Sequence, residues 1–438
     1  MTFDEAKRWL LDEARRLVVD LEVLGSLQRE LRINAQDGKA GETTVSTRGG
    51  VGLRVVTGGR VGYASTEDLA EESLAWALSE AIENASLQKG SGAALPAGEA
   101  LGRHDLLDEG LSGSVAEKRD MALSLEASLR RDERVQAVQY ALYAESQGET
   151  VIGSTRGVDG SYRDGGAMMV SSVVMREGAS VKQGFEQEAA NDFHQLDPGR
   201  TALRAIEGLG RLLGARPLTT GRRRAVFEPR VVGTLLRLLV YALSGKTLAE
   251  GKSALAGKLG QRIAADLLTI VDDPTLPGGL ASRPFDSEGT RSRRTVLVER
   301  GVLRSFLHNT DTAARTGQET TGHAHRSYSG TLGVAPTNLI LEPGAGIAPG
   351  DGVLVTDLMG VHAGANPITG DVSVQAMGLE TVGGETFPVD DFAVSFNLFE
   401  LLRRVEEVGD DSETRPLMGG GAVVVPSIAV PDVSFAGK

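Results

Sequence analysis

Apolar residues near the start of the chain recur at steps of three and four, which places them along one side of a helix. These positions are Phe3, Ala6, Leu10, Ala14, Leu17 and Leu21. Thr2 and Glu5 have the spacing of a capping box, in which each side chain binds a free backbone N–H at the helix start. The pattern predicts an N-terminal helix with an apolar stripe that runs to Leu21.

Alternating and β-branched segments follow and predict strands. Gly58-Gly59 separates two of them and is typical of a two-residue hairpin, because glycine tolerates positive φ. Helices are predicted after Ser65, with an apolar stripe to Ala85, and after the capping box of Ser114 and Glu117. The other elements predicted in this half are strands around 26–34, 43–46, 52–57, 60–65, 135–144, 166–175 and 179–186, and a helix near 198–213.

The second half opens with Pro229, which suits the first position of a helix. Val231–Leu243 is apolar nearly all round, so this helix is expected to be buried. Strands and glycine-rich turns follow, with a late helix predicted near 393–408 and terminal strands at 422–425 and 430–435.

This order predicts an α+β fold with two domains. In residues 1–216, helices pack on a largely antiparallel sheet, and residues 217–438 form a β-rich domain that resembles a barrel or sandwich. The boundary is placed in Gly214–Arg224, which contains Pro217 and three consecutive arginines.

The amino-acid composition excludes several kinds of active site and partner. The 438 residues include no cysteine, which excludes disulfides, thiolate-ligated metals and a cysteine nucleophile. A net charge of −13 argues against nucleic acid as a partner. No signal peptide or membrane-spanning stretch is visible, so we expect a cytoplasmic protein with no membrane partner.

Few residues have the spacing of an active site. His323 and His325 would share one face of a strand and could offer two ligands to a metal, with His362 as a third if the fold brings it near. A solvated loop is the simpler interpretation of this segment. Ser244-Gly245-Lys246-Thr247 lacks the first glycine of a phosphate-binding loop, and Ser86 with Lys89 has only the spacing of a serine–lysine dyad.

Several segments, taken together and in order, resemble one family, the TldD/TldE (PmbA) proteins, also called modulators of DNA gyrase. The Leu358-Met359-Gly360 and Ile368-Thr369-Gly370-Asp371 segments resemble its TldE/PmbA branch in particular. The full set is Arg48–Val55, Gly59–Thr66, Phe285–Gly289, Arg294–Leu303, Thr321–Ala324, Leu358–Gly360, Asn366–Ser373 and Val408–Arg415.

The resemblance implies a zinc metallopeptidase system that acts on unfolded peptides. Its TldD branch carries an H-E-x-x-x-H helix and a cysteine in a late glycine-rich loop. At the matching positions this chain has Arg237, Leu238 and Ala242, and Gly419-Gly420-Gly421 near the cysteine position. Arginine stays protonated and the other two side chains have no donor atoms, so no zinc site is expected here.

The resemblance therefore favours a non-catalytic subunit without a cofactor of its own, paired with a TldD-like subunit that holds the zinc. Two alternatives stay open. The chain could be a homodimeric peptide-binding or scaffold protein, or a hydrolase with a metal site at His323 and His325.

Overall fold

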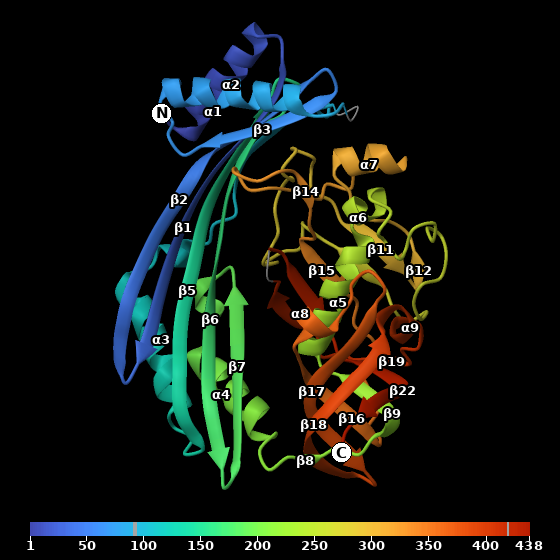
Figure 1. Ribbon diagram of the computed structural model, residues 1–438. Coiled ribbons are helices and arrows are strands. Elements are labelled where there is room, and N and C mark those ends of the chain that lie inside the picture. Colours follow the sequence, from blue (N-terminus) through green and yellow to red (C-terminus); the bar gives the residue numbers. More distant parts are fainter. Residues whose placement is uncertain (91–93, 418–419) are drawn as a thin grey trace.

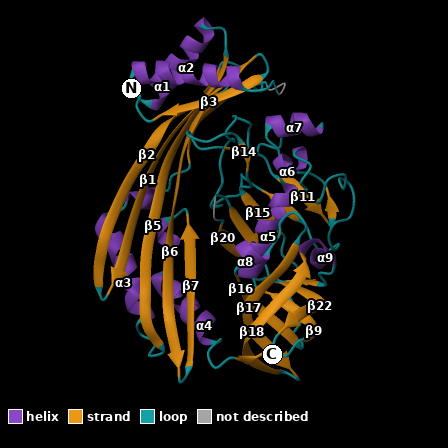
Figure 2. Cartoon of the chain, viewed as in Figure 1, coloured by secondary structure: helices purple, strands orange, loops and turns teal. Residues whose placement is uncertain are grey.

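The computed structural model describes residues 1–90, 94–417 and 420–438. Its N-terminal half is built on one long, curved sheet of seven strands (Figures 1 and 2). The strand order is β3-β2-β1-β5-β6-β4, and β7 also pairs with β6. All these pairings are antiparallel except β4 with β6. The strands are β1 (Asp20–Gln36), β2 (Lys39–Thr57), β3 (Arg60–Thr66), β4 (Ala100–Asp105), β5 (Val135–Ser154), β6 (Asp159–Glu177) and β7 (Ser180–Ala190).

Two pairs of helices cover this sheet. Helices α1 (Phe3–Arg16) and α2 (Glu71–Leu87) pack on an apolar cluster that includes Leu21 and Val23. Helices α3 (Val115–Leu129) and α4 (Pro198–Gly210) pack on a second cluster that includes Leu31 and Ile33. All four β1 residues are odd-numbered, so they lie on one face of the strand. The even-numbered residues of β1 lie on the opposite face, which is turned toward the C-terminal half.

Several predicted details of this half are confirmed. Gly58 and Gly59 have φ of 55° and 70° in the β2–β3 hairpin. Both capping boxes are present. Two details are wrong. The first helix ends at Arg16 because Val18 adopts a φ of 57°, so Leu21 lies on β1. Ser65 belongs to β3, and Ala70 is the N-cap of α2 without a side-chain bond.

The C-terminal half contains a barrel-like sheet and a second sheet beside it. The first has the order β19-β22-β9-β16-β17-β18-β8 and closes through an extra pairing of β22 with β18. The second has the order β12-β11-β10-β15-β21-β20. A separate pair joins β13 and β14. The bounds are β8 (Arg216–Pro217), β9 (Gly221–Phe227), β10 (Ile270–Asp272), β11 (Thr295–Glu299), β12 (Val302–Leu303), β13 (Ala324–His325), β14 (Gly333–Val334), β15 (Asn338–Leu341), β16 (Gly352–Met359), β17 (Asp371–Val382), β18 (Glu385–Asn397), β19 (Glu407–Val408), β20 (Glu413–Pro416), β21 (Ala422–Val425) and β22 (Ile428–Ala436).

Helix α5 (Pro229–Leu243) is the central helix of this half, with Pro229 in its first turn and most of its residues buried, as predicted. The other helices are short: α6 (Gly245–Ala249), α7 (Thr310–Thr316), α8 (Val361–Gly364) and α9 (Leu398–Arg403). The late helix predicted near 393–408 is wrong over most of its length, since β18 continues to Asn397 and α9 ends at Arg403.

These sheets and helices confirm the predicted α+β class, with a largely antiparallel N-terminal sheet and a barrel-like C-terminal sheet. None of the helices in the described ranges is long and apolar enough to cross a membrane.

Candidate functional site

The three residues of helix α5 that stand at the positions of the TldD zinc motif lie in three different environments. Arg237 is solvent-exposed, Leu238 packs partly buried against the C-terminal core, and Ala242 is fully buried. The Arg237 side chain forms no hydrogen bond or ion pair with another described residue. None of the three can serve as a zinc ligand, because a guanidinium stays protonated and the other two side chains are hydrocarbon. A zinc ion does not fit these residues.

The neighbouring strands show which part of the C-terminal half α5 faces. A Cβ atom built on Gly233 would lie 3.1 Å from Cγ2 of Val423 on β21. Arg237 follows Gly233 by four residues and so lies on the same side of the helix. That side faces β20 and β21, the hairpin that carries the late glycine-rich loop. In that loop Gly419 lies outside the described residues, while Gly420 and Gly421 have φ of 102° and 93°.

His323 is part of a buried polar network. Its Nε2 lies 2.9 Å from Oδ1 of Asp272, and its Nδ1 lies 2.8 Å from Oγ1 of Thr321. The amide N–H of Thr337 donates to the other oxygen of Asp272 at 2.8 Å. Both ring nitrogens of His323 are therefore already engaged by protein atoms, and their role here is structural.

The other two histidine candidates do not join His323. His325 is exposed on β13, and its Cε1 lies 4.0 Å from the position of a Cβ built on Gly420. His362 is exposed on the short helix α8. Throughout the described part of the chain, no group of three or more His, Asp or Glu side chains is arranged to hold a metal ion.

A buried cluster of four charges joins the two halves of the molecule. Nη1 of Arg54 on β2 lies 2.6 Å from Oε1 of Glu288 and 3.3 Å from Oε2 of Glu22 on β1. Nη2 of Arg326 binds Oε1 of Glu22 at 3.0 Å. All four side chains are at most 2% exposed, so their charges compensate one another without help from bulk water. The strands of the N-terminal sheet are thereby fixed to loops of the C-terminal half.

Glycines in the Arg48–Val55 segment make this contact possible. A Cβ on Gly52 would lie 1.9 Å from the backbone oxygen of Tyr328, and a Cβ on Gly50 would lie 2.7 Å from the Tyr328 ring. Oη of Tyr328 donates to Glu67 at 2.6 Å. The segment that follows His325 can therefore pass directly over β2. Segments that carry the family resemblance, although far apart in sequence, thus meet at the junction between the halves.

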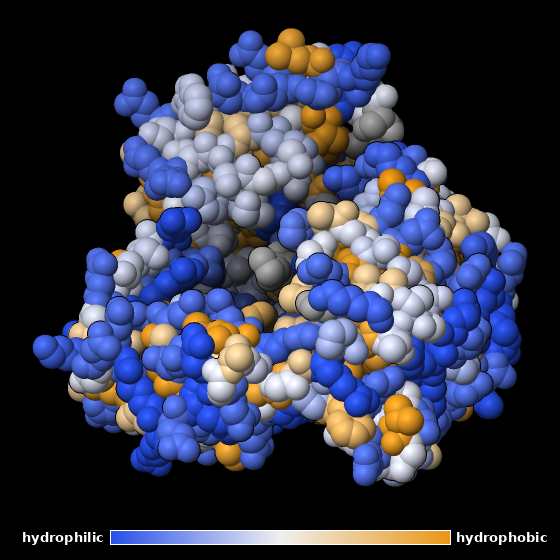
Figure 3. Space-filling model, turned by 60° about the horizontal axis from the view of Figure 1, so that its bottom comes forward, coloured by the Kyte–Doolittle hydropathy of each residue, from blue (hydrophilic) through white to orange (hydrophobic). Residues whose placement is uncertain are grey.

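Two strand edges face each other below this junction. Strand β7 pairs only with β6 and β20 pairs only with β21 among the described residues, yet β7 and β20 lie close together. Nη1 of Arg415 on β20 lies 3.5 Å from Oε1 of Glu186 on β7, and Nη2 of Arg230 on α5 donates to the backbone oxygen of Phe185 at 2.6 Å. A groove of about 1120 Å³ is lined by residues of both edges. Figure 3 shows that the surface is hollowed between the two halves.

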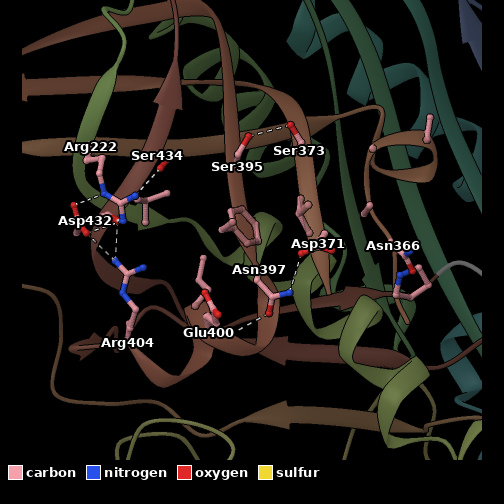
Figure 4. A pocket seen from close by; sticks show the side chains of 18 residues that line it. Arg222, Asn366, Asp371, Ser373, Ser395, Asn397, Glu400, Arg404, Asp432 and Ser434 are labelled. Atoms are coloured by element: carbon pink, nitrogen blue, oxygen red, sulfur yellow. Dashed lines mark hydrogen bonds and ion pairs between the residues drawn. The ribbon is translucent and has the colours of Figure 1, made fainter. Parts of the chain in front are cut away.

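A second cavity of about 1000 Å³ lies at the barrel and is lined in part by the two ends of the Asn366–Ser373 segment (Figure 4). Its polar groups bind one another. The guanidinium of Arg222 forms a two-pronged pair with Asp432, and Nδ2 of Asn397 donates to Asp371 at 3.0 Å. This segment therefore stabilises a turn, and we assign no reaction to this cavity.

The family comparisons agree with the fold. Sequence models of PmbA/TldA metallopeptidase domain 1, the central domain and the C-terminal domain match residues 21–85, 110–213 and 220–437. The metalloprotease PmbA of Escherichia coli O157:H7 is 28% identical over 97% of each chain. A PmbA homologue of Haemophilus influenzae is 28% identical over 87% of this chain and 85% of that protein.

Solved structures show the same overall arrangement. A protein of Thermotoga maritima described as a modulator of DNA gyrase is 27% identical, with a TM-score of 0.88 over 99% of this chain and 100% of its own. TldE of Thermococcus kodakarensis shares the fold, with a TM-score of 0.86 and 23% identity over 98% of this chain and 100% of its own. The chain belongs to the PmbA/TldD metallopeptidase family.

Proposed function

We propose that this chain is a TldE/PmbA-like subunit that holds no zinc and works with a zinc-bearing TldD-like subunit on unfolded peptides. The observation that carries the proposal is the set of side chains on α5. Arg237, Leu238 and Ala242 stand where the resemblance places two zinc-binding histidines and a glutamate. Catalysis by a zinc-bound water needs ligands and a proton acceptor, and these side chains provide neither.

The strand edges support a role in holding peptides. An extended peptide can add to a free strand edge through backbone hydrogen bonds, which depend little on its sequence. The outer edges of β7 and β20 have no strand partner among the described residues, and they line the groove between the halves. Arg230 already binds one backbone oxygen of β7, so only part of that edge is open to a peptide.

Co-expression with a TldD-like chain tests the pairing. The proposal predicts a stable one-to-one complex that cleaves unfolded peptides, while this chain alone cleaves none. Activity of the complex should disappear when the zinc motif of the partner is changed and should persist when His362→Ala is introduced here. Failure to form a complex would favour a homodimeric peptide-binding protein. Activity of the isolated chain that is lost when His323 and His325 are both replaced by alanine would favour a metal site of its own.

A further inference from the structure

The outer edge of β2 has no partner along much of its length. Strand β2 pairs with β1 almost throughout, but β3 pairs only with its residues 51–57. In the described part of the chain, no strand pairs with the outer edge of residues 40–50. Figure 1 shows β2 at the side of the sheet that lies away from the C-terminal half. Another molecule can therefore reach this edge without entering the groove between the halves.

The turn at Gly58-Gly59 shows which backbone groups point out of this edge. Thr57 and Arg60 flank the two-residue turn and form a hydrogen-bonded pair. Backbone N–H and C=O groups alternate in direction along an antiparallel strand, so every second residue before Thr57 also points away from β1. Below the end of β3 these residues are Thr43, Val45, Thr47 and Gly49. Their backbone groups point to the side on which β2 has no partner strand.

The sequence of this edge favours pairing with a further strand. Edge strands are usually protected by charged residues, by proline or by a covering segment. The stretch Thr43-Thr44-Val45-Ser46-Thr47 contains no charge, proline or glycine, and four of its five residues are β-branched. Val45 is 51% exposed, so a strand laid beside it would bury apolar surface. This edge is therefore suited to strand addition.

We propose that this edge pairs with the same edge of a second copy of this chain, antiparallel and with Val45 facing Val45 across a twofold axis. Val45 is the midpoint of the open stretch 40–50, so this register uses the whole stretch and stops where β3 begins. Thr43 then faces Thr47 of the second copy. Both residues point their backbone groups outward, as a hydrogen-bonded pair requires.

The charges beside this stretch fit the same register. Glu42 and Arg48 stand three residues on either side of Val45, are exposed, and form no ion pair with another described residue. Their even separation puts both side chains on one face of the strand. Across the twofold axis, Glu42 of each copy faces Arg48 of the other in a non-hydrogen-bonded pair, where side chains are closest. One edge thus supplies both partners of every contact, which identifies a second copy as the occupant.

This pairing goes beyond the proposed subunit role and does not depend on it. The interface joins two seven-stranded sheets edge to edge and leaves the groove between the halves open. A TldD-like subunit can still bind each copy, which keeps the ratio of the two kinds of chain at one to one.

Sedimentation velocity of the full chain over a range of concentrations tests the proposal. The wild-type chain should form a dimer as concentration rises. Glu42→Arg and Arg48→Glu each place like charges opposite one another twice, and each should weaken dimerisation about tenfold or more. The double variant Glu42→Arg/Arg48→Glu exchanges the charges and should restore it. Glu83→Arg changes an exposed residue of α2 and is the control that should dimerise like wild type.

Val45→Pro tests the backbone contacts separately. Proline removes the central outward N–H, which has no partner strand in the isolated chain, so the variant should fold and stay monomeric. A urea midpoint close to that of wild type would show that it folds. A wild-type chain that is monomeric at every concentration would overturn the proposal, as would single charge variants that dimerise like wild type or a double variant as weak as the single ones. Loss of the TldD-like partner in Val45→Pro, with no self-association of wild type, would assign the edge to that partner instead.

Discussion

At the scale of single residues, the stability of the molecule depends on a few positions where a larger side chain has no room or a buried polar atom has no partner. Gly52 is one, because Tyr328 crosses β2 where a Cβ would lie. His308 is another, because it is 1% exposed and its Nε2 has no partner among the described residues. The sequence shows where the glycines stand, but it could not identify the segment that approaches them.

Gly52→Ala should lower the free energy of unfolding by about 1–3 kcal/mol, because the new methyl group would overlap backbone that cannot move as a side chain can. Gly208→Ala on α4 is the matched control. Nothing lies within 4 Å of its built Cβ, so it should be neutral or should stabilise the helix by up to about 1 kcal/mol. Urea denaturation measures both values, and equal stabilities of the two variants would contradict the steric interpretation.

His308 predicts a pH dependence of stability. Burial, with a contribution from His323, lowers its pKa to about 4, against 6.5 in the unfolded chain. Between these values the unfolded chain binds a proton that the folded chain does not. Stability contributed by neutral His308 is therefore complete above about pH 6.5 and is lost as pH falls toward 4, by up to about 3 kcal/mol.

Urea denaturation from pH 4 to 7 measures this dependence. His308→Gln should have a shallower stability profile than wild type across this window, and the exposed control His362→Gln should follow wild type. Parallel profiles for wild type and His308→Gln would show that His308 does not titrate in this way.

At the scale of elements, sequence periodicity predicted the helices better than their ends. The apolar pattern located α5 and its proline start because these features lie within one helix. It could not indicate that Arg54 would bind Glu288, which is 234 residues away, since no local pattern encodes such a pair. The histidine pair shows the same limit, because the partner of His323 is Asp272 on β10, 51 residues away.

The buried cluster predicts a large effect of removing one charge. Arg54→Met should lower the free energy of unfolding by about 3–5 kcal/mol, because Glu22 and Glu288 would remain buried without compensation. Arg304→Met removes an exposed partner of Glu299, where both side chains are about half exposed, and should change stability by less than about 1 kcal/mol. Comparable effects in urea denaturation would mean that the junction does not depend on this cluster.

At the scale of the whole molecule, the fold class and the family were accessible from the sequence, and the arrangement of the halves was not. The segments that carry the family resemblance are separated along the chain, but several of them meet at the junction around Arg54, Glu288 and Arg326. Their shared role in joining the halves explains why they identify the family without revealing an active site.

We propose that this chain supports a peptidase without holding its metal. Elemental analysis of the purified chain, alone and in complex with a TldD-like partner, tests this proposal. We expect no stoichiometric zinc in the isolated chain and one zinc per pair of chains in the complex. One tightly held zinc in each isolated chain would contradict it.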